Sequence, residues 1–428
     1  MSRTLPKSLE VTPSAARLTG SLRDIGYDFH TAIADLVDNS VAANATRVDV
    51  EIAFDPGESY VTISDDGDGM SANGLVEALR YGTRRAYGRG DLGRFGLGLK
   101  TASLSQCRRL TVASRRSASV ARISTRTLDL DLIEEWDEWL IVDDEPTELL
   151  RRATSALGEG PGTVVIWQKL DRVLAGRQAE TGWGRRRMAG LAQKTAQHLR
   201  MVFHRFISGL PDGRQLVLSV NGEKLKPWDP FAVDELATVS FPPQLFELEV
   251  GGTTGEVAMR GFVLPPKNKF SSPAEFEELS GPLKWNRQQG LYIYRANRMV
   301  QFGGWSGLRA VDEHTKLARA SLDFDTDLDE AFQINVAKMR VNIPPSLKQM
   351  LERPVHELCV TADDTYRKAS RSKPAATTSD RRQVDLGDVG VSLRAAAMEA
   401  GQLGALTQAF EVLKVRNPDL WKALGLDR

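Results

Sequence analysis

The most specific indication of the fold is the stretch Asp35-Leu36-Val37-Asp38-Asn39-Ser40. Apolar residues recur at helical spacing from Tyr27 to about Ala43, which predicts a helix there. On a helix, Asp35 and Asn39 are one turn apart and share a face. The amide of Asn39 is an oxygen ligand suited to magnesium, and the carboxylate of Asp35 is placed to orient water toward a phosphate. Taken alone, the segment also fits an ordinary amphipathic helix with a polar face.

The second segment is Asp65-Asp66-Gly67-Asp68-Gly69-Met70, which follows the predicted strand Tyr60-Val61-Thr62-Ile63. A carboxylate at the end of a buried strand, here Asp65, can accept a hydrogen bond from the exocyclic amine of adenine. Gly67 and Gly69 let the backbone turn closely beneath a flat base because they have no Cβ. A surface turn is the plain alternative for this segment alone.

A calcium loop is another interpretation of these acidic residues, and their spacing excludes it. A loop that starts at Asp66 places Glu77 at the twelfth position, as such a loop requires. Met70 and Ser71, however, stand where an oxygen ligand and an obligatory glycine are needed. The sequence therefore predicts no calcium site at this turn.

The third segment is Gly93-Arg94-Phe95-Gly96-Leu97-Gly98, which leads into a predicted helix between Gly98 and Ser105. Glycines before a helix can present backbone N–H groups to phosphates. The segment nearly matches a P-loop, but Leu99 separates the last glycine from Lys100. It also follows a polar loop instead of a strand, so the P-loop and the dinucleotide-binding fingerprint are both excluded.

In this order, the three segments resemble the GHKL ATPase superfamily, which includes gyrase B, MutL, histidine kinases and a class of heat-shock chaperones. The resemblance covers residues from about 20 to 170 and implies the Bergerat fold, an α/β sandwich that binds ATP and Mg2+ under a lid, here Tyr81 to Arg94. It implies Asp35 as the water-activating acid, Asn39 as the magnesium ligand and Asp65 as the adenine acceptor. The other positions that it assigns border the base (Gly67, Gly69, Met70), enclose the phosphates (Gly93, Phe95, Gly96, Leu97, Gly98) or support Asp65 (Thr163).

Two departures from the superfamily bear on hydrolysis. The catalytic acid is usually Glu, so Asp35 reaches about 1.5 Å less far, and misplacement on that scale can lower a rate on the order of a hundredfold. The superfamily also often has Asp-Ala a few residues after the Asn, where this chain has Ser40-Val41-Ala42-Ala43. The resemblance therefore implies ATP binding with slow turnover.

The order of predicted elements gives an α/β (α+β) chain: a Bergerat sandwich, an α/β transducer-like domain and a helical tail. A variable, acid-rich excursion is expected from Leu128 to Asp144. One long helix, Gly184 to Ser208, is expected to leave the first domain, and the strand Gln215–Val220 to open the second. The expected boundaries are an arm (1–20), the ATP-binding domain (21–183), a connecting helix (184–209), the transducer-like domain (210–365), a flexible linker (366–390) and the tail (391–428).

A further motif lies in the second domain. Tyr292–Val300 has the sequence YIYRANRMV and resembles the YRxNRhI segment of MORC ATPases and their bacterial relatives. In those proteins the segment belongs to a transducer domain, which sends a lysine to the γ-phosphate of ATP. The resemblance implies Lys338, within Gln333–Val341, as that catalytic lysine. A strand and turn with surface arginines, and a solvated lysine, are the plain alternatives.

Charge and cysteine content indicate which binding partners and which cellular compartment to expect. In 428 residues, 56 basic side chains balance 56 acidic ones, which argues against a strongly basic nucleic-acid-binding surface. Cys107 and Cys359 are expected to be free thiols in a reducing compartment. No apolar stretch suits secretion or a membrane span, so a cytoplasmic protein without membrane contact is expected.

The leading functional hypothesis is a switch of MORC or MutL type. ATP would order the lid and the arm, two copies would pair as an ATP-dependent homodimer, and hydrolysis would reset them. DNA is the expected target, with a partner nuclease or another defence-system protein; the run Arg185-Arg186-Arg187 fits phosphate contact or a solvated helix face. A non-hydrolysing ATP sensor and a chaperone-like ATPase acting on proteins stay open. A histidine kinase is disfavoured because only His30 precedes the three segments, too close to them for a phospho-accepting domain.

Overall fold

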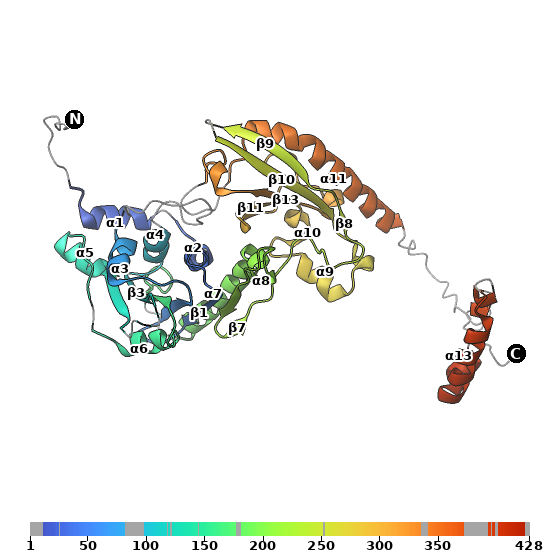
Figure 1. Ribbon diagram of the computed structural model, residues 1–428, viewed down its shortest axis with the longest axis horizontal. Helices are drawn as coiled ribbons and strands as arrows, with labels where there is room; N and C mark the ends of the chain where they lie inside the picture. Colours follow the sequence, from blue (N-terminus) through green and yellow to red (C-terminus); the bar gives the residue numbers. More distant parts are fainter. Residues whose placement is uncertain are drawn as a thin grey trace. The chain divides into compact units, whose positions relative to one another are not determined.

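The computed structural model in Figure 1 describes most of the chain. Two compact units, Met1–Ser370 and Arg371–Arg428, are each described by themselves. The described residues are 12–24, 26–81, 98–117, 119, 122–143, 145–176, 181–250, 253–334, 341–371, 393–394, 396–398 and 401–423.

Within the described residues, the first sheet of the larger unit has the strand order β4-β3-β5-β2-β1-β6-β7. Its pairs are antiparallel except for β1 and β6, which run parallel. Because alternate residues of a strand point to opposite sides of the sheet, the nearly continuous burial of β3 and β5 means that the centre of the sheet is covered on both faces. The strands are β1 (Arg47–Ala53), β2 (Tyr60–Asp65), β3 (Arg109–Arg115), β4 (Ser124–Asp129), β5 (Gly162–Gln168), β6 (Val217–Val220) and β7 (Glu223–Lys224).

Helices cover this sheet and complete the sandwich. The central helix is α2, in which Ile33 and Val37 are fully buried, and it contacts α4, α7 and β2. On β5, Val165 and Trp167 belong to the same core as α2, whereas Val164 and Ile166 pack in a second cluster with α6. The predicted α/β sandwich is therefore confirmed. The helices are α1 (Ala15–Arg23), α2 (Phe29–Ala42), α3 (Ala72–Leu79), α4 (Gly98–Leu104), α5 (Leu130–Trp136), α6 (Glu148–Ser155), α7 (Gly182–Val202) and α8 (His204–Ser208).

A second sheet follows the path β12-β11-β13-β10-β8, with β9 paired to β10. It is also mixed, since β11 and β13 are parallel. The long helix α11 lies along β9 and β10 (Figure 1) and buries Leu347, Leu351 and Leu358 on one side. The elements are β8 (Val239–Ser240), β9 (Gln244–Val250), β10 (Thr253–Val263), η1 (Lys267–Lys269), α9 (Pro273–Leu279), α10 (Lys284–Gln288), β11 (Gly290–Arg295), β12 (Arg298–Phe302), η2 (Glu313–Thr315), β13 (Ala318–Phe324), η3 (Thr326–Leu328) and α11 (Pro345–Arg371).

The strand expected to open the second domain, Gln215–Val220, was assigned to the wrong sheet. It forms β6, which joins the first sheet beside β1. The backbone N–H of Val217 donates to the Thr46 carbonyl at 2.8 Å, and the Asn221 side chain accepts from the Ile52 N–H at 2.7 Å. Long-range pairing of this kind is not encoded in the local pattern of the strand itself, so the sequence placed it in the neighbouring domain.

The connecting helix also differs from expectation. It is interrupted at Phe203, which is fully buried and has a non-helical backbone, so α7 ends at Val202 and α8 begins at His204. Helix α7 contacts α2, β1 and β6 of the first layer and also β12 of the second sheet, so it lies between the two sheets. The burial of Phe203 in the core accounts for the break.

Two further segments contain more helix than the sequence indicated, and the tail is helical as expected. The acid-rich excursion contains the end of β4 and all of α5, since Leu128, Leu130 and Ile133 are buried beneath the charged residues. Helix α11 continues to Arg371, inside the expected linker. In the smaller unit, the helical tail contains α13 (Leu403–Arg416) and α14 (Pro418–Ala423).

Two remaining features are the state of the cysteines and the apolar character of the helices. Cys107 and Cys359 are both free and buried, as expected. Among the described residues, no helix combines the length and the apolar character needed to cross a membrane.

Candidate functional site

Helix α2 presents its two predicted site residues differently. Asp35 is buried, with 3% of its surface exposed, and accepts a hydrogen bond from the Tyr27 hydroxyl at 3.0 Å. Burial, reinforced by the charge of Asp35, raises the pKa of Tyr27, so this hydroxyl keeps its proton and remains a donor. Asn39, one turn later, is exposed. The helix therefore offers an oriented carboxylate inside and an amide that a ligand can reach.

Asp65 ends β2 beside the last turn of α2. Its Oδ2 accepts from the Ser40 hydroxyl at 2.8 Å, and its Oδ1 accepts from the Gly67 N–H at 3.0 Å. Burial raises the pKa of Asp65, although these hydrogen bonds favour the ionised form. The carboxylate is thus fixed in orientation by the helix on one side and by its own turn on the other.

A hydroxyl network supports the turn from the neighbouring strands. Thr163 lies opposite Asp65 in the pairing of β2 with β5, and its hydroxyl is 2.9 Å from that of Ser114 on β3. The Ser114 hydroxyl also accepts from the Met70 N–H at 2.8 Å and donates to the Gly162 carbonyl at 2.9 Å. Thr163 therefore supports the site in two ways: its backbone N–H favours the ionised form of Asp65, and its hydroxyl joins this network through Ser114. Ser114, Ser40 and Tyr27 were not predicted, although Ser114 is a polar end to a strand that is otherwise largely apolar.

Three glycines bring backbone segments closer together than any side chain would allow. A Cβ on Gly67 would stand 2.6 Å from the Ala43 carbonyl oxygen at the end of α2. At Gly69, where φ is +63°, it would stand 2.0 Å from the Arg115 carbonyl oxygen. At Gly162, where φ is +151°, it would stand 2.2 Å from the Asp65 carbonyl oxygen. These glycines therefore let the β2 turn pack directly against the end of α2 and against the neighbouring strands β3 and β5.

Replacing Gly69 with Ala tests this packing. We expect a loss of more than about 2 kcal/mol in the free energy of unfolding, because left-handed strain adds to a contact with Arg115. Gly158→Ala is the matched control, since its φ is +52° but nothing lies within 4 Å of the new Cβ. That variant should lose only about 1 kcal/mol. Equal losses in urea denaturation would contradict the close approach at Gly69.

Comparison with known proteins identifies this arrangement. Residues 27–159 match the family model described as histidine kinase-, DNA gyrase B- and HSP90-like ATPase. This segment is a GHKL ATPase domain. The match contains α2, the β2 turn and β3, whereas Gly162 and Thr163 on β5 lie just beyond it.

Curated relatives share part of the GHKL domain. The DNA mismatch repair protein MutL of Shewanella sediminis (strain HAW-EB3) is 40% identical over 95 residues, or 21% of this chain and 15% of that protein. MutL of Shewanella sp. (strain MR-4) is 38% identical over 90 residues, 20% of this chain and 14% of its own length. MutL of Paramagnetospirillum magneticum (strain ATCC 700264 / AMB-1) is 34% identical over 89 residues. The similarity is therefore MutL-like and spans about a seventh of these relatives.

Lys100 has a structural place in the GHKL domain. It lies on α4 with 1% of its surface exposed, and its ammonium donates to the carbonyls of Ala78 and Arg80 at 2.8 Å each. These carbonyls belong to the C-terminal end of α3, where a positive charge is favourable. Burial lowers the pKa of Lys100 to about 8. The sequence had excluded this lysine from a P-loop, and its position beneath α3 is compatible with that exclusion.

Several predicted positions lie outside the described residues: Gly93, Phe95, Gly96, Leu97 and Lys338. Gly98 is the first residue of α4. Met70 is partly buried and packs against the main core of the GHKL domain. The structure therefore brings together the predicted residues of α2, the β2 turn and β5, and the phosphate loop remains a prediction.

Proposed function

We propose that this chain is an ATP-binding and ATP-hydrolysing molecular switch that pairs with a second copy when ATP binds. One observation carries the proposal: buried Asp35 and exposed Asn39 stand one turn apart on α2, and the same helix fixes the adenine-type acceptor Asp65 through Ser40. Membership of residues 27–159 in the GHKL family supports ATP as the nucleotide.

The residues divide the work of binding. Asp65 accepts a hydrogen bond from the adenine amine, and Gly67 and Gly69 border the base, as the family resemblance implies. The glycines of the segment 93–98 contact the phosphates, as the sequence predicts. Lys338 approaches the γ-phosphate from the second domain, which remains a prediction from the sequence.

The catalytic step belongs to α2. Asn39 offers its amide oxygen to magnesium, which neutralises phosphate charge when bound. Asp35 orients the attacking water and receives its proton, while the Tyr27 hydroxyl holds the carboxylate in place. Because Asp35 is shorter than the Glu usual at this position, turnover should be slow.

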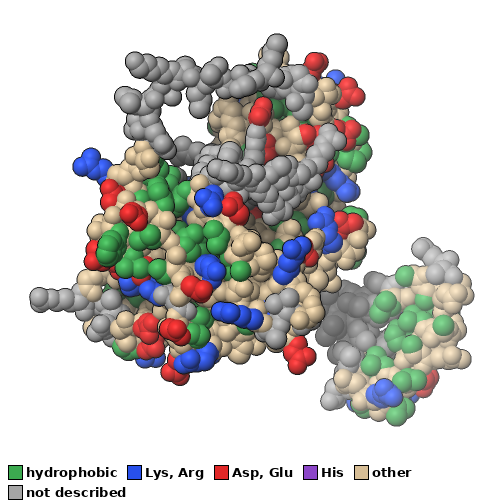
Figure 2. All heavy atoms as spheres, turned by 60° about the vertical axis from the view of Figure 1, so that its left-hand side comes forward, with side chains coloured by type: hydrophobic (Ala, Val, Ile, Leu, Met, Phe, Trp, Pro, Cys, Tyr) green, Lys and Arg blue, Asp and Glu red, His purple; other side chains and the backbone are tan. Residues whose placement is uncertain are grey.

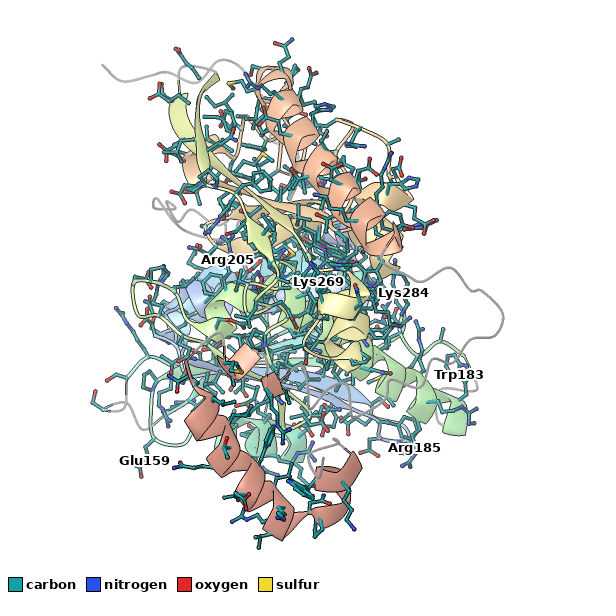
Figure 3. All side chains as sticks on the ribbon, turned by 90° about the vertical axis from the view of Figure 1, so that its right-hand side faces the viewer. Glu159, Trp183, Arg185, Arg205, Lys269 and Lys284 are labelled. Atoms are coloured by element: carbon teal, nitrogen blue, oxygen red, sulfur yellow. The ribbon has the colours of Figure 1, made fainter. Side chains whose placement is uncertain are left out.

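DNA is the proposed target of the switch, within DNA maintenance or antiviral defence in the cytoplasm. The names of the MutL relatives favour DNA, although the region that they share with this chain is only a small part of each relative. On the face in Figure 2, basic and acidic side chains are interspersed, so electrostatic attraction alone is a weak basis for DNA binding. The exposed arginines Arg185 to Arg187 on α7 are the proposed contact, and Figure 3 shows Arg185 beside Trp183 at the N-terminal end of that helix.

A second candidate is a non-hydrolysing ATP sensor. The substitution of Asp for Glu at position 35, with only 3% of the residue exposed, favours it specifically. ATP turnover by the unmodified chain separates the two functions, because a sensor binds ATP without releasing phosphate.

The proposed switch is tested by sizing the full chain with and without a non-hydrolysable ATP analogue and magnesium. A dimer that forms only with nucleotide is the expected result, since the γ-phosphate is proposed to order the dimer contacts. ATP turnover is then measured on the same preparation. A chain that binds the analogue yet stays monomeric would contradict the proposed ATP-dependent pairing. Bound ATP without turnover would contradict the proposed ATP hydrolysis.

A further inference from the structure

The second sheet reaches α2 through a buried ion pair. Arg298, at the start of β12, donates from Nε to Oδ1 of Asp38 at 3.2 Å. The side chains are 4% and 0% exposed, so both charges are withdrawn from water. Asp38 lies between the predicted water-activating acid and the predicted magnesium ligand of α2, and neither the family resemblance nor the comparisons give it a role.

The hairpin that carries Arg298 is tightly specified. Its two turn residues, Ala296 and Asn297, have φ values of +46° and +68°, which is the backbone of a two-residue type I′ turn. Arg295 and Arg298 are therefore directly paired across the hairpin. Arg295 forms its own buried ion pair with Asp329 inside the second domain, at 2.6 Å. The hairpin thus points one arginine into its own domain and the other toward α2.

Among the described residues, Asp38 is the carboxylate that forms an ion pair with Arg298. Arg298 also donates to the Met299 carbonyl at 2.7 Å, and its guanidinium lies 5.5 Å from the centre of the Phe203 ring. Burial, together with the charges of His30 and Arg298, holds the pKa of His198 on α7 well below its usual value. His198 is therefore neutral and balances no charge, and the positive charge of Arg298 is directed at Asp38.

The residues on both sides of Asn39 are held by different parts of the molecule. Asp38 binds Arg298 of the second sheet, and Ser40 donates to Asp65 of the first sheet at 2.8 Å. A rotation or shift of α2 relative to either sheet would break one of these contacts. The turn of α2 that carries the exposed Asn39 is therefore held in place by both sheets.

We propose that Arg298 is a positioning residue for the magnesium–nucleotide site, which it controls from the second sheet by holding α2 through Asp38. The inference rests on the proposed ATP binding and adds a coupling to it. Movement of the second sheet changes the orientation of Asn39 and hence the affinity for magnesium-bound nucleotide. In the reverse direction, magnesium and nucleotide at Asn39 favour one position of the second sheet.

The test compares the affinity for a non-hydrolysable ATP analogue with and without magnesium, by calorimetry on the full chain. In Asp38→Asn and in Arg298→Lys, the gain in affinity that magnesium gives should fall about tenfold or more, because Asn39 is displaced. Affinity without magnesium should change less than about threefold, since Asp65 and its partners are untouched. The double variant should be no worse than the stronger single one, as expected for residues that act through one contact.

Asp323→Asn is the matched control. Asp323 on β13 pairs with Arg205 of α8, which stacks 3.5 Å from the Tyr294 ring centre and is labelled in Figure 3. This ion pair also joins the second sheet to a helix outside it, here α8, but it does not involve α2. The control should keep the full magnesium effect.

Loss of folding would not conceal the result. The combination Asp38→Leu with Arg298→Met replaces the buried pair with apolar groups of similar size, a change that proteins often tolerate. It should fold and still lose the magnesium effect. An unchanged magnesium effect in the folded variants, or an equal loss in Asp323→Asn, would overturn the coupling. Failure of the unmodified chain to bind the analogue would instead overturn the proposed function on which the coupling rests.

Discussion

Replacing Asp35 with Asn is expected to lower the rate of ATP hydrolysis about a hundred- to ten-thousand-fold, the usual contribution of a general base. The amide oxygen of Asn can still accept the hydrogen bond from Tyr27, so the local packing should persist. Affinity for ATP should therefore change less than about threefold, because base binding depends on other residues. Phosphate release at saturating ATP measures the first quantity, and equilibrium binding measures the second.

Asp35→Glu is the informative companion variant. It restores the acid that is usual in the superfamily and lengthens the side chain by one methylene. If the short reach of Asp35 limits turnover, this variant should hydrolyse ATP faster than the unmodified chain, provided that the buried site accommodates the longer side chain beside Tyr27. Equal hydrolysis by the unmodified chain and Asp35→Asn would remove Asp35 from the mechanism.

Asp65→Ala is expected to weaken ATP binding about 10- to 150-fold, which corresponds to about 1.5–3 kcal/mol for a hydrogen bond to a charged group. The loss should be specific to the base. ATP should no longer be preferred over GTP. The guanine of GTP carries a carbonyl in place of the adenine amine, from which Asp65 is proposed to accept a hydrogen bond. Competition of the two nucleotides for the same site measures both effects.

Asp68→Ala is the control for Asp65. Asp68 belongs to the same turn, is exposed and accepts from the Asn44 side chain at 2.9 Å. It should leave ATP affinity and the preference over GTP unchanged. A similar loss in both variants would mean that the turn, and not the Asp65 carboxylate, recognises the base.

Local pattern was sufficient for the elements that hold the site. Helical spacing around Ile33 and Val37 predicted α2, and the apolar stretch before Asp65 predicted β2 with its glycine turn. The structure shows that Gly67 and Gly69 pack against the backbone of Ala43 and Arg115, whereas their predicted approach to a base stays a prediction. The helix and the strand depend on residues that are near one another in the sequence.

Features that depend on distant residues could not be predicted. The pairing of β6 with β1 joins residues more than a hundred positions apart, so the sequence assigned that strand to the wrong domain. Ser114 supports the β2 turn from β3, and Arg298 contacts Asp38 although the two are 260 positions apart in the chain. A motif indicated that Arg298 was unusual, but only the fold shows which carboxylate it meets.

The most direct test of the central claim is a calorimetric titration of ATP into the unmodified chain in the presence of magnesium. The contacts of Asp65 and the exposure of Asn39 predict saturable binding of one ATP per chain, with lower affinity when magnesium is removed. Absence of saturable binding with ATP in large excess would contradict the assignment of α2 and the β2 turn as a nucleotide site.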